Sequence, residues 1–305
     1  MTDIRIGIIG CDTSHTPAFS RILTDKNDPY YVPGCRVVAA YPSFSEDLPF
    51  SKSRVEGFTQ QLRECCDVTL VDSVEALVAQ VDAVMLESVD GRRHLPEVRP
   101  VLAANKPVFI DKPMAACYRE AAEIVSLVEA SGGRAFSASS LRWDANIRAL
   151  KADPTLGDVV GCDAYSPAKL DPTNPGLFWY GVHGVETLYE FMGPGCQSVT
   201  CHFTPGAEVV VGHWADGRLG TVRGTREGSH DYGARVFGSE RVAQSSYSHE
   251  VPLYSGLVAR IVAFFQGGPA PVPLCETLET MAFMQAALLS AQEGREVRLE
   301  EIVGG

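Results

Sequence analysis

The chain has 305 residues and a formal net charge of −12, and 45% of its residues are hydrophobic against 21% charged. This length suits about two domains of ordinary globular composition. An acidic chain without a basic cluster repels nucleic acid and anionic membranes, so we expect neither as a partner. The first apolar stretch is too short for a signal peptide or a spanning helix. The nine scattered cysteines form no C-x-x-C pair, which favours reduced thiols in the cytoplasm.

The N-terminal part of the chain alternates between short apolar strands and amphipathic helices. We expect strands at residues 4–10, 36–41, 68–71, 83–86, 107–110 and 134–139. Helices are expected at residues 16–23, 53–65, 73–78, 94–105 and 115–131, the first capped by Thr16 with Pro17 at its first position. Such alternation predicts an α/β domain with a doubly wound parallel sheet, Rossmann-like and dinucleotide-binding, over residues 1–141.

The remaining residues, 142–305, have a different pattern. Strands with alternating polarity are expected at residues 159–165, 198–203, 208–214, 218–223, 234–237 and 241–245, with a hairpin turn at Asp216-Gly217. Helices are expected at residues 143–151, 183–191, 253–266 and 276–293. Consecutive strands predict an α+β domain with a mostly antiparallel sheet. Few helices remain to cover that sheet, so we expect its open face to form a homodimer or homotetramer interface.

The first strand ends in Gly10, and the next five residues determine what the turn can hold. A strand that turns sharply into a helix directs backbone amides at a pyrophosphate. The dinucleotide fingerprint G-x-G-x-x-G would place glycines where this chain has Asp12 and His15. Asp12 repels a phosphate unless its oxygens are turned away, whereas Thr13, Ser14 and His15 offer donors. We therefore expect Gly10 through His15 to form a divergent phosphate turn.

Two further clusters carry residues suited to chemistry. Asp111-Lys112-Pro113 ends the fifth strand, and ligands of open α/β sheets bind at the carboxyl ends of strands. His183 lies one helical turn before Glu186, which makes Glu186 a candidate for orienting the imidazole. Tyr180 and Trp179 would give this cluster an aromatic wall. The alternatives are a solvated lysine and a core histidine.

In their order along the chain, these motifs resemble the glucose–fructose oxidoreductase / inositol dehydrogenase / MocA (Gfo/Idh/MocA) family. Asp111-Lys112-Pro113 resembles the family's Glu-Lys-Pro, and His183 matches the histidine of its Asp-x-x-x-His motif. Ser88 through His94 resembles the segment after strand four, and Arg142-Trp143 resembles the Arg-aromatic pair that opens the second domain. The resemblance spans essentially the whole chain.

The resemblance implies a nicotinamide cofactor and a set of site residues. Lys112 and His183 would be catalytic, with His183 taking the hydroxyl proton and Lys112 stabilising the alkoxide. The remaining expectations divide between cofactor and substrate. Cofactor-binding residues would be Gly10, Asp12, Thr13, Ser14, His15, Ser43, Ser88, His94, Asp111, Lys112 and Pro113. Substrate-binding residues would be Arg142, Trp179, Tyr180 and Glu186.

Two departures from the family pattern concern specificity. Trp179 stands where the family has the aspartate of its histidine motif, and its apolar face suits stacking on a sugar or ring. The second strand is followed by Tyr41-Pro42-Ser43, without the acid that binds the adenosine ribose. The missing acid favours NADP over NAD. The alternative is that no dinucleotide binds.

The sequence leaves three functions open. The first is an NAD(P)-dependent oxidoreductase acting on a secondary alcohol of a sugar, polyol or related ring. The second is a non-redox ligand-binding or regulatory protein with a degenerate nucleotide site. The third is a lyase or glycosidase that recycles its cofactor. We expect no metal site, although Asp12, His15, Asp90 and His94 offer a remote alternative.

Overall fold

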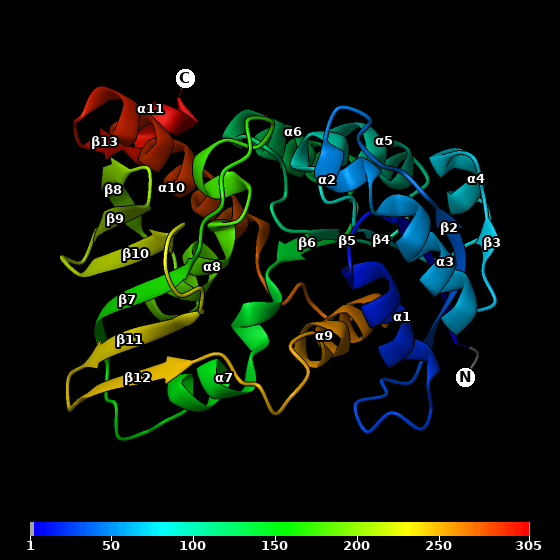
Figure 1. Cartoon of the computed structure of the whole chain (residues 1–305), viewed down its shortest axis with the longest axis horizontal. Helices are drawn as coiled ribbons and strands as arrows, with labels where there is room; N and C mark the ends of the chain where they lie inside the picture. Colours follow the sequence, from blue (N-terminus) through cyan, green and yellow to red (C-terminus); the bar gives the residue numbers. More distant parts are fainter. Residues whose placement is uncertain (1–2, 305) are drawn as a thin grey trace. The chain divides into compact units, whose positions relative to one another are not determined.

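The computed structural model describes residues 3–304 of the chain. These residues divide into two compact units. The first comprises residues 3–115, 119–138 and 254–274, and the second comprises residues 116–118, 139–253 and 275–304. The fold is therefore α/β with two units, as the sequence predicts (Figure 1).

The first unit contains a six-stranded parallel sheet in the order β3-β2-β1-β4-β5-β6. Its strands are β1 (Ile4–Ile9), β2 (Cys35–Tyr41), β3 (Thr69–Leu70), β4 (Ala83–Leu86), β5 (Val108–Asp111) and β6 (Ala135–Ala138). Strand order reverses between β1 and β4. In a doubly wound sheet this reversal opens a crevice at the carboxyl ends of the strands, which is where ligands bind.

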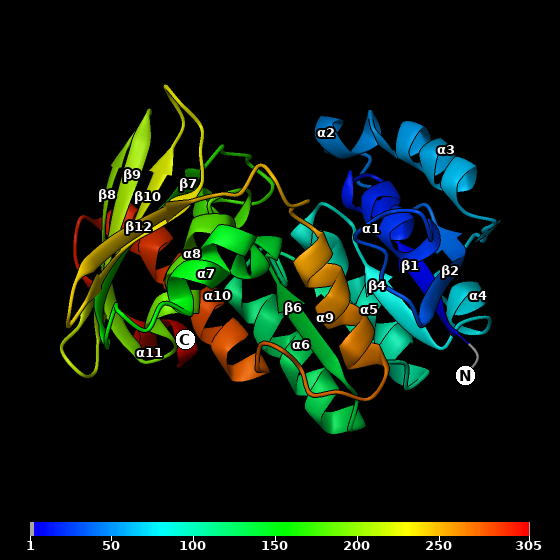
Figure 2. The same cartoon turned by 90° about the horizontal axis from the view of Figure 1, so that it is seen from below.

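Helices cover both faces of this sheet (Figure 2). They are α1 (His15–Thr24), α2 (Pro49–Lys52), α3 (Val55–Cys65), α4 (Val74–Val78), the 3-10 helix η1 (Gly91–Arg93), α5 (His94–Ala103), α6 (Tyr118–Ser131) and α9 (Ser255–Phe265). Helix α1 packs on α3 and α9, whereas α4 packs on α5. The four residues of β4 are all buried, as are those of β5, because both faces are covered.

Helix α9 follows the second sheet in sequence but packs in the first unit. The ring of Phe136 lies 5.0 Å from that of Phe264 on α9. Arg134 donates to the carbonyl oxygens of Phe264 and Gly268, at 2.7 and 2.6 Å. The sequence predicts a domain boundary at residue 141, and this boundary stays a prediction. Residues 254–274 lie after it in the sequence but pack in the first unit.

The second unit contains a seven-stranded sheet in the order β12-β11-β7-β10-β9-β8-β13. Its strands are β7 (Val159–Pro167), β8 (Cys196–Thr204), β9 (Ala207–Trp214), β10 (Leu219–Thr225), β11 (Gly233–Gly238), β12 (Val242–Ser246) and β13 (Val297–Arg298). Its helices are η2 (Ser140–Trp143), α7 (Ala145–Lys151), η3 (Gly176–Phe178), α8 (Val182–Met192), α10 (Leu274–Glu293) and α11 (Leu299–Val303). All neighbouring strands are antiparallel except β7 and β10, so the sheet is mixed and mostly antiparallel.

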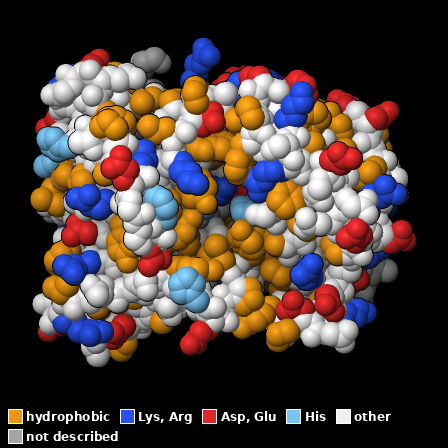
Figure 3. Space-filling view, viewed as in Figure 1, with side chains coloured by type: hydrophobic (Ala, Val, Ile, Leu, Met, Phe, Trp, Pro, Cys, Tyr) orange, Lys and Arg blue, Asp and Glu red, His pale blue; other side chains and the backbone are white. Residues whose placement is uncertain are grey.

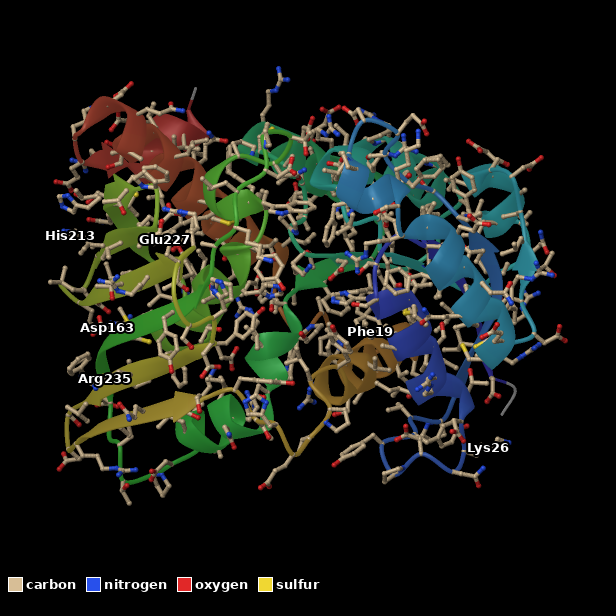
Figure 4. All side chains as sticks on the ribbon, viewed as in Figure 1. Phe19, Lys26, Asp163, His213, Glu227 and Arg235 are labelled. Atoms are coloured by element: carbon tan, nitrogen blue, oxygen red, sulfur yellow. The ribbon has the colours of Figure 1, made fainter. Side chains whose placement is uncertain are left out.

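Helix α8 packs on β7, β10 and β11. The other face of this sheet carries a hollow of about 540 Å³, lined in part by Asp163, Thr221 and Arg235. Figure 4 labels Asp163 on β7 and Arg235 on β11. The oligomer interface expected on this face stays a prediction.

The surface view in Figure 3 shows acidic and basic side chains interspersed over the face drawn. Within residues 3–304, the helices are all too short or too polar to cross a membrane.

The sequence misplaces the start of the first helix and misses α2. Helix α1 begins at His15, and the hydroxyl of Thr16 donates to the carbonyl oxygen of Gly10 at 3.1 Å in place of capping the helix. Helix α2 has only four residues, too few for a helical period to appear in the sequence.

Candidate functional site

The turn after β1 depends on glycine at position 10. Gly10 has φ +87°, and a Cβ there would lie 2.3 Å from the backbone nitrogen of Ser88. Only glycine therefore allows this turn to approach the loop that follows β4. The turn delivers Asp12, Thr13 and Ser14 to the N-terminus of α1.

Asp12 is fully buried, and both of its carboxylate oxygens are engaged. Oδ2 accepts from the hydroxyl of Ser51 on α2 at 2.5 Å, and Oδ1 accepts from the backbone N–H of Val89 at 3.0 Å. Burial raises the pKa of Asp12 to about 6, because these two donors offset only part of the lost hydration. The carboxyl group thus joins three segments, the turn, α2 and the loop after β4.

His15 takes the place of the third glycine and contacts the lysine motif. Its Nδ1 lies 2.7 Å from Oδ2 of Asp111, and its ring stacks on Phe19 at 5.0 Å between centroids. Figure 4 labels Phe19 on α1. The ring of Tyr254 meets His15 edge-on at 4.8 Å. His15 and Asp111 both differ from the family pattern, and in the structure their side chains lie next to each other.

Asp111 also holds Lys112. Its Oδ1 accepts the backbone N–H of Lys112 at 2.9 Å, and its Oδ2 lies 3.8 Å from Lys112 Nζ. Burial opposes ionisation of Asp111, but the charges of His15 and Lys112 outweigh it and hold the pKa of Asp111 below its usual range. The peptide bond between Lys112 and Pro113 is cis.

Glu97, which the sequence analysis missed, joins two predicted cofactor residues. Its carboxylate accepts from the hydroxyl of Ser43 and from that of Ser88, the latter at 2.6 Å. Arg93 donates to Glu97 at 3.1 Å and to Ser43 Oγ at 3.0 Å. The end of β2 and the loop after β4 are therefore tied together by a buried carboxylate with a cation beside it.

His94 is fully buried and links the segments after β4 and β5. Its Nε2 lies 2.7 Å from the carbonyl oxygen of Ser88, and its Nδ1 lies 3.2 Å from that of Met114. Asp90, in turn, binds Ser45 and Arg92. The four residues of the remote metal alternative thus have separate partners, and residues 3–304 contain no group of three or more His, Cys, Asp or Glu arranged to hold a metal.

Glu87, directly after β4, is a further acid that the sequence analysis missed. It is fully buried, and burial raises its pKa well above the usual range. The charges of Asp111 and Asp12 add to this shift. Its surroundings therefore favour the neutral carboxyl group, since the ionised form would be a buried charge among other acids.

In the second unit, His183 lies in the first turn of α8 and contacts Ser139. Its Nδ1 is 2.8 Å from Ser139 Oγ. The rings of Tyr180 and Tyr232 meet the imidazole edge-on at 5.4 and 5.7 Å, and the Tyr232 hydroxyl donates to that of Tyr180 at 3.2 Å. Trp179, half-buried, directly precedes Tyr180. The expected aromatic wall around His183 is thus built by two tyrosines.

Glu186 does not orient His183 directly, because its carboxylate binds Arg142. Arg142 is buried and also donates to Glu276 at 2.6 Å and to Glu190 at 3.5 Å. Burial raises the pKa of Glu186, and Arg142 only partly counters this. The substrate-binding role expected of Arg142 and Glu186 stays a prediction; in the structure they are each other's partners.

Comparison with known proteins shows what the two parts of the chain resemble. Residues 4–139 match the Gfo/Idh/MocA model, described as an oxidoreductase family with an NAD-binding Rossmann fold. The match covers the N-terminal part of the chain, whose six-stranded parallel sheet has the Rossmann topology that this model describes. No curated protein sequence matches the chain.

Solved structures resemble the whole chain. Myo-inositol 2-dehydrogenase from Lactobacillus plantarum has a TM-score of 0.79 at 14% identity, with 97% of this chain and 99% of that chain covered. Myo-inositol dehydrogenase from Lactobacillus casei, in complex with NAD(H) and myo-inositol, has a TM-score of 0.75 at 16% identity, covering 97% of each chain. An oxidoreductase from Agrobacterium radiobacter, in complex with NAD+, L-tartaric acid and magnesium, gives 0.75 at 17%, covering 98% and 99%. At these identities the likeness shows the fold alone.

The turn after β1 fits the pyrophosphate that an NAD-binding family implies. The backbone amides of Thr13 and Ser14 donate no hydrogen bond within the described part of the chain, and they stand at the N-terminus of the ten-residue helix α1. Helix N-termini with unpaired amides favour anions. Because Ser51 and Val89 hold both oxygens of Asp12, the carboxylate is fixed by the protein's own donors.

Proposed function

We propose that the protein is an NAD(P)-dependent oxidoreductase that acts on a secondary alcohol of a sugar, polyol or related ring. The observation that carries this proposal is the position of Lys112 at the carboxyl end of β5, in a unit whose glycine turn fits a pyrophosphate. The bound nicotinamide would accept or supply the hydride. Lys112 and His183 are the candidate catalytic residues.

The chain's own residues would bind and orient the reactants. Gly10, Thr13 and Ser14 would hold the pyrophosphate, while Asp111 positions Lys112 through its backbone N–H and its side chain. Trp179 and Tyr180 would offer apolar faces to a ring. A lysine beside a carboxylate can stabilise developing alkoxide charge or exchange a proton with it.

We propose NADP ahead of NAD. No acid stands in Tyr41-Pro42-Ser43 at the end of β2, where Arg93 donates to Ser43 Oγ at 3.0 Å and also pairs with Glu97. NAD-specific sites use an acid on the ribose hydroxyls directly after this strand, so its absence from Tyr41-Pro42-Ser43 supports a 2′-phosphate.

A substrate screen with each cofactor tests the proposal. Purified protein is mixed with NAD+ or NADP+ and a panel of polyols, inositols, sugars and sugar acids, and reduced nicotinamide is followed by fluorescence. We expect turnover with at least one compound, and a loss of at least about 100-fold in Lys112→Met, the scale of general acid–base catalysis. Lys106→Met, two residues before the same strand, is the matched control and keeps activity.

Other outcomes of the screen identify the two alternatives. Tight ligand binding without any turnover would make the protein a non-redox binder. Substrate consumption with bound cofactor but no net reduced nicotinamide would make it a lyase or glycosidase that recycles its cofactor. Either result would contradict the proposed function.

A further inference from the structure

The hydroxyl of Ser139 makes two contacts in a fully buried position. Ser139 ends the segment after β6 and caps the 3-10 helix η2, where its Oγ accepts the backbone N–H of Leu141 at 3.2 Å. The same Oγ lies 2.8 Å from His183 Nδ1. Among residues 3–304, these are the two partners of the Ser139 hydroxyl.

Counting protons decides the direction of the contact with His183. A serine hydroxyl has one proton to donate and two lone pairs to accept with. Leu141 uses a lone pair, so the buried proton still needs an acceptor, since an unpaired buried hydroxyl costs free energy. His183 Nδ1 is the atom in position to accept it. A neutral imidazole that accepts at Nδ1 carries its own proton at Nε2.

The backbone of Ser139 is held by the helix that carries His183. Glu186, one turn after His183 on α8, accepts the N–H of Ser139, and Arg142 holds the Glu186 carboxylate. One face of α8 therefore contacts Ser139 twice, at its N–H through Glu186 and at its hydroxyl through His183. His183 and Glu186 are three residues apart on the helix, so their side chains lie on the same face and can both reach Ser139. Ser139 thus connects Glu186 to His183.

We propose that Ser139 is a positioning residue that fixes neutral His183 in the Nε2–H form. In this form His183 donates a hydrogen bond from Nε2 to a substrate oxygen and has no lone pair there for the hydroxyl proton, which in alcohol oxidation would pass to Lys112 while the hydride passes to the nicotinamide. A carboxylate at Nδ1 would do the opposite, because it can only accept and so leaves Nε2 free to act as a base. The consequence for catalysis rests on the proposed function, whereas the protonation site does not.

Nitrogen NMR of ligand-free protein tests the protonation site directly. Histidine labelled with 15N is observed by long-range 1H–15N correlation, and His183→Gln assigns the signal among the seven histidines. We expect neutral His183 to be protonated at Nε2 in the wild-type protein. A wild-type His183 protonated at Nδ1 would overturn the proposal. Because neither cofactor nor substrate is present, this result is independent of whether the oxidoreductase function holds.

Variants at position 139 show whether the serine sets this form. Ser139→Asp offers only acceptors, so His183 should switch to the Nδ1–H form. Ser139→Ala should change the ratio of the two forms by roughly 2- to 10-fold, the equivalent of one hydrogen bond, and Ser139→Thr should restore the wild-type ratio. Ser140→Ala, the neighbouring serine, is the control. An unchanged ratio in Ser139→Ala overturns the proposal even where Ser139→Asp fails to fold.

Discussion

His15 and His183 are both buried, and each has Nδ1 within hydrogen-bond distance of an oxygen, but the oxygens differ in kind. His15 faces the carboxylate of Asp111 at 2.7 Å, and His183 faces the hydroxyl of Ser139 at 2.8 Å. A carboxylate only accepts, whereas a hydroxyl with one lone pair already used donates. Similar distances to an oxygen therefore do not mean the same environment, because the oxygen near His15 Nδ1 can only accept a proton and the one near His183 Nδ1 has a proton to donate.

The two histidines also differ in how their partners are supported. Asp111 is stabilised as an anion by the positive groups of His15 and Lys112. Ser139 is uncharged. The charges of Arg142 and Glu186 compensate each other, and Glu186 contacts the backbone N–H of Ser139, so neither charged group is the partner of His183 Nδ1. In the first unit a charged carboxylate lies next to the imidazole of His15, whereas in the second unit a neutral hydroxyl separates the imidazole of His183 from the nearby charged groups.

The largest effect is expected from removing the charge that supports the second arrangement. Arg142→Met leaves Glu186, Glu190 and Glu276 without their shared cation. It should lower the free energy of unfolding by about 3–5 kcal/mol, the usual cost of breaking a buried ion pair. Urea denaturation measures it. Arg148→Met, which removes an exposed partner of Glu190, is the control and should cost at most about 1 kcal/mol. Equal losses would refute the distinction.

The free energy of unfolding, measured over a range of pH, tests the role of the buried carboxyl group of Asp12 in the first unit. The pKa of Asp12 is raised from 3.8 to about 6, so the folded state binds its proton more tightly than the unfolded state. The contribution of Asp12 to stability is then greatest below pH 4 and falls as pH rises to about 6, by about 3 kcal/mol at 1.36 kcal/mol per pKa unit. Comparing Asp12→Asn with wild type at each pH isolates this fall.

Asp82 provides the control with the opposite sign. Arg5 lowers its pKa, so its contribution to stability appears as pH rises and is lost in acid. Because Asp82 is exposed, the effect should be small. If Asp12→Asn shows the same fall as the wild type between pH 4 and 6, the buried carboxyl is not responsible.

A smaller effect on the free energy of unfolding is expected when His15 and Asp111 are replaced by the glycine and glutamate of the family pattern. His15→Gly and Asp111→Glu should each destabilise the protein, while the double variant should lose less than their sum. The coupling between residues in contact is about 0.5–3 kcal/mol, measured by a double-mutant cycle in urea. His15→Gly with Asp82→Glu is the matched control and should be additive within about 0.5 kcal/mol. Additivity of the first pair would show that the departures are independent.

Sequence patterns predict the fold well because period and spacing are local. The alternation of strands and helices, the glycine at position 10 and the lysine after β5 are all visible in short windows. The role of Ser51 is not visible in this way. Ser51 lies on a helix of only four residues, so its hydrogen bond to Asp12 leaves no pattern in the sequence. Glu186 has the right spacing to orient His183, but spacing does not reveal that Arg142 occupies its carboxylate. The serine that contacts His183 lies 44 positions away.

Dinucleotide titration by calorimetry tests the central claim most directly. The wild-type protein should bind one NADP+ or NAD+ per chain, with NADP+ the tighter ligand. Gly10→Ala should abolish binding, since its Cβ would meet the Ser88 backbone at 2.3 Å, while Gly57→Ala, where a Cβ meets nothing within 4 Å, should bind as the wild type does. Absence of binding heat with both dinucleotides in the wild-type protein would contradict the account.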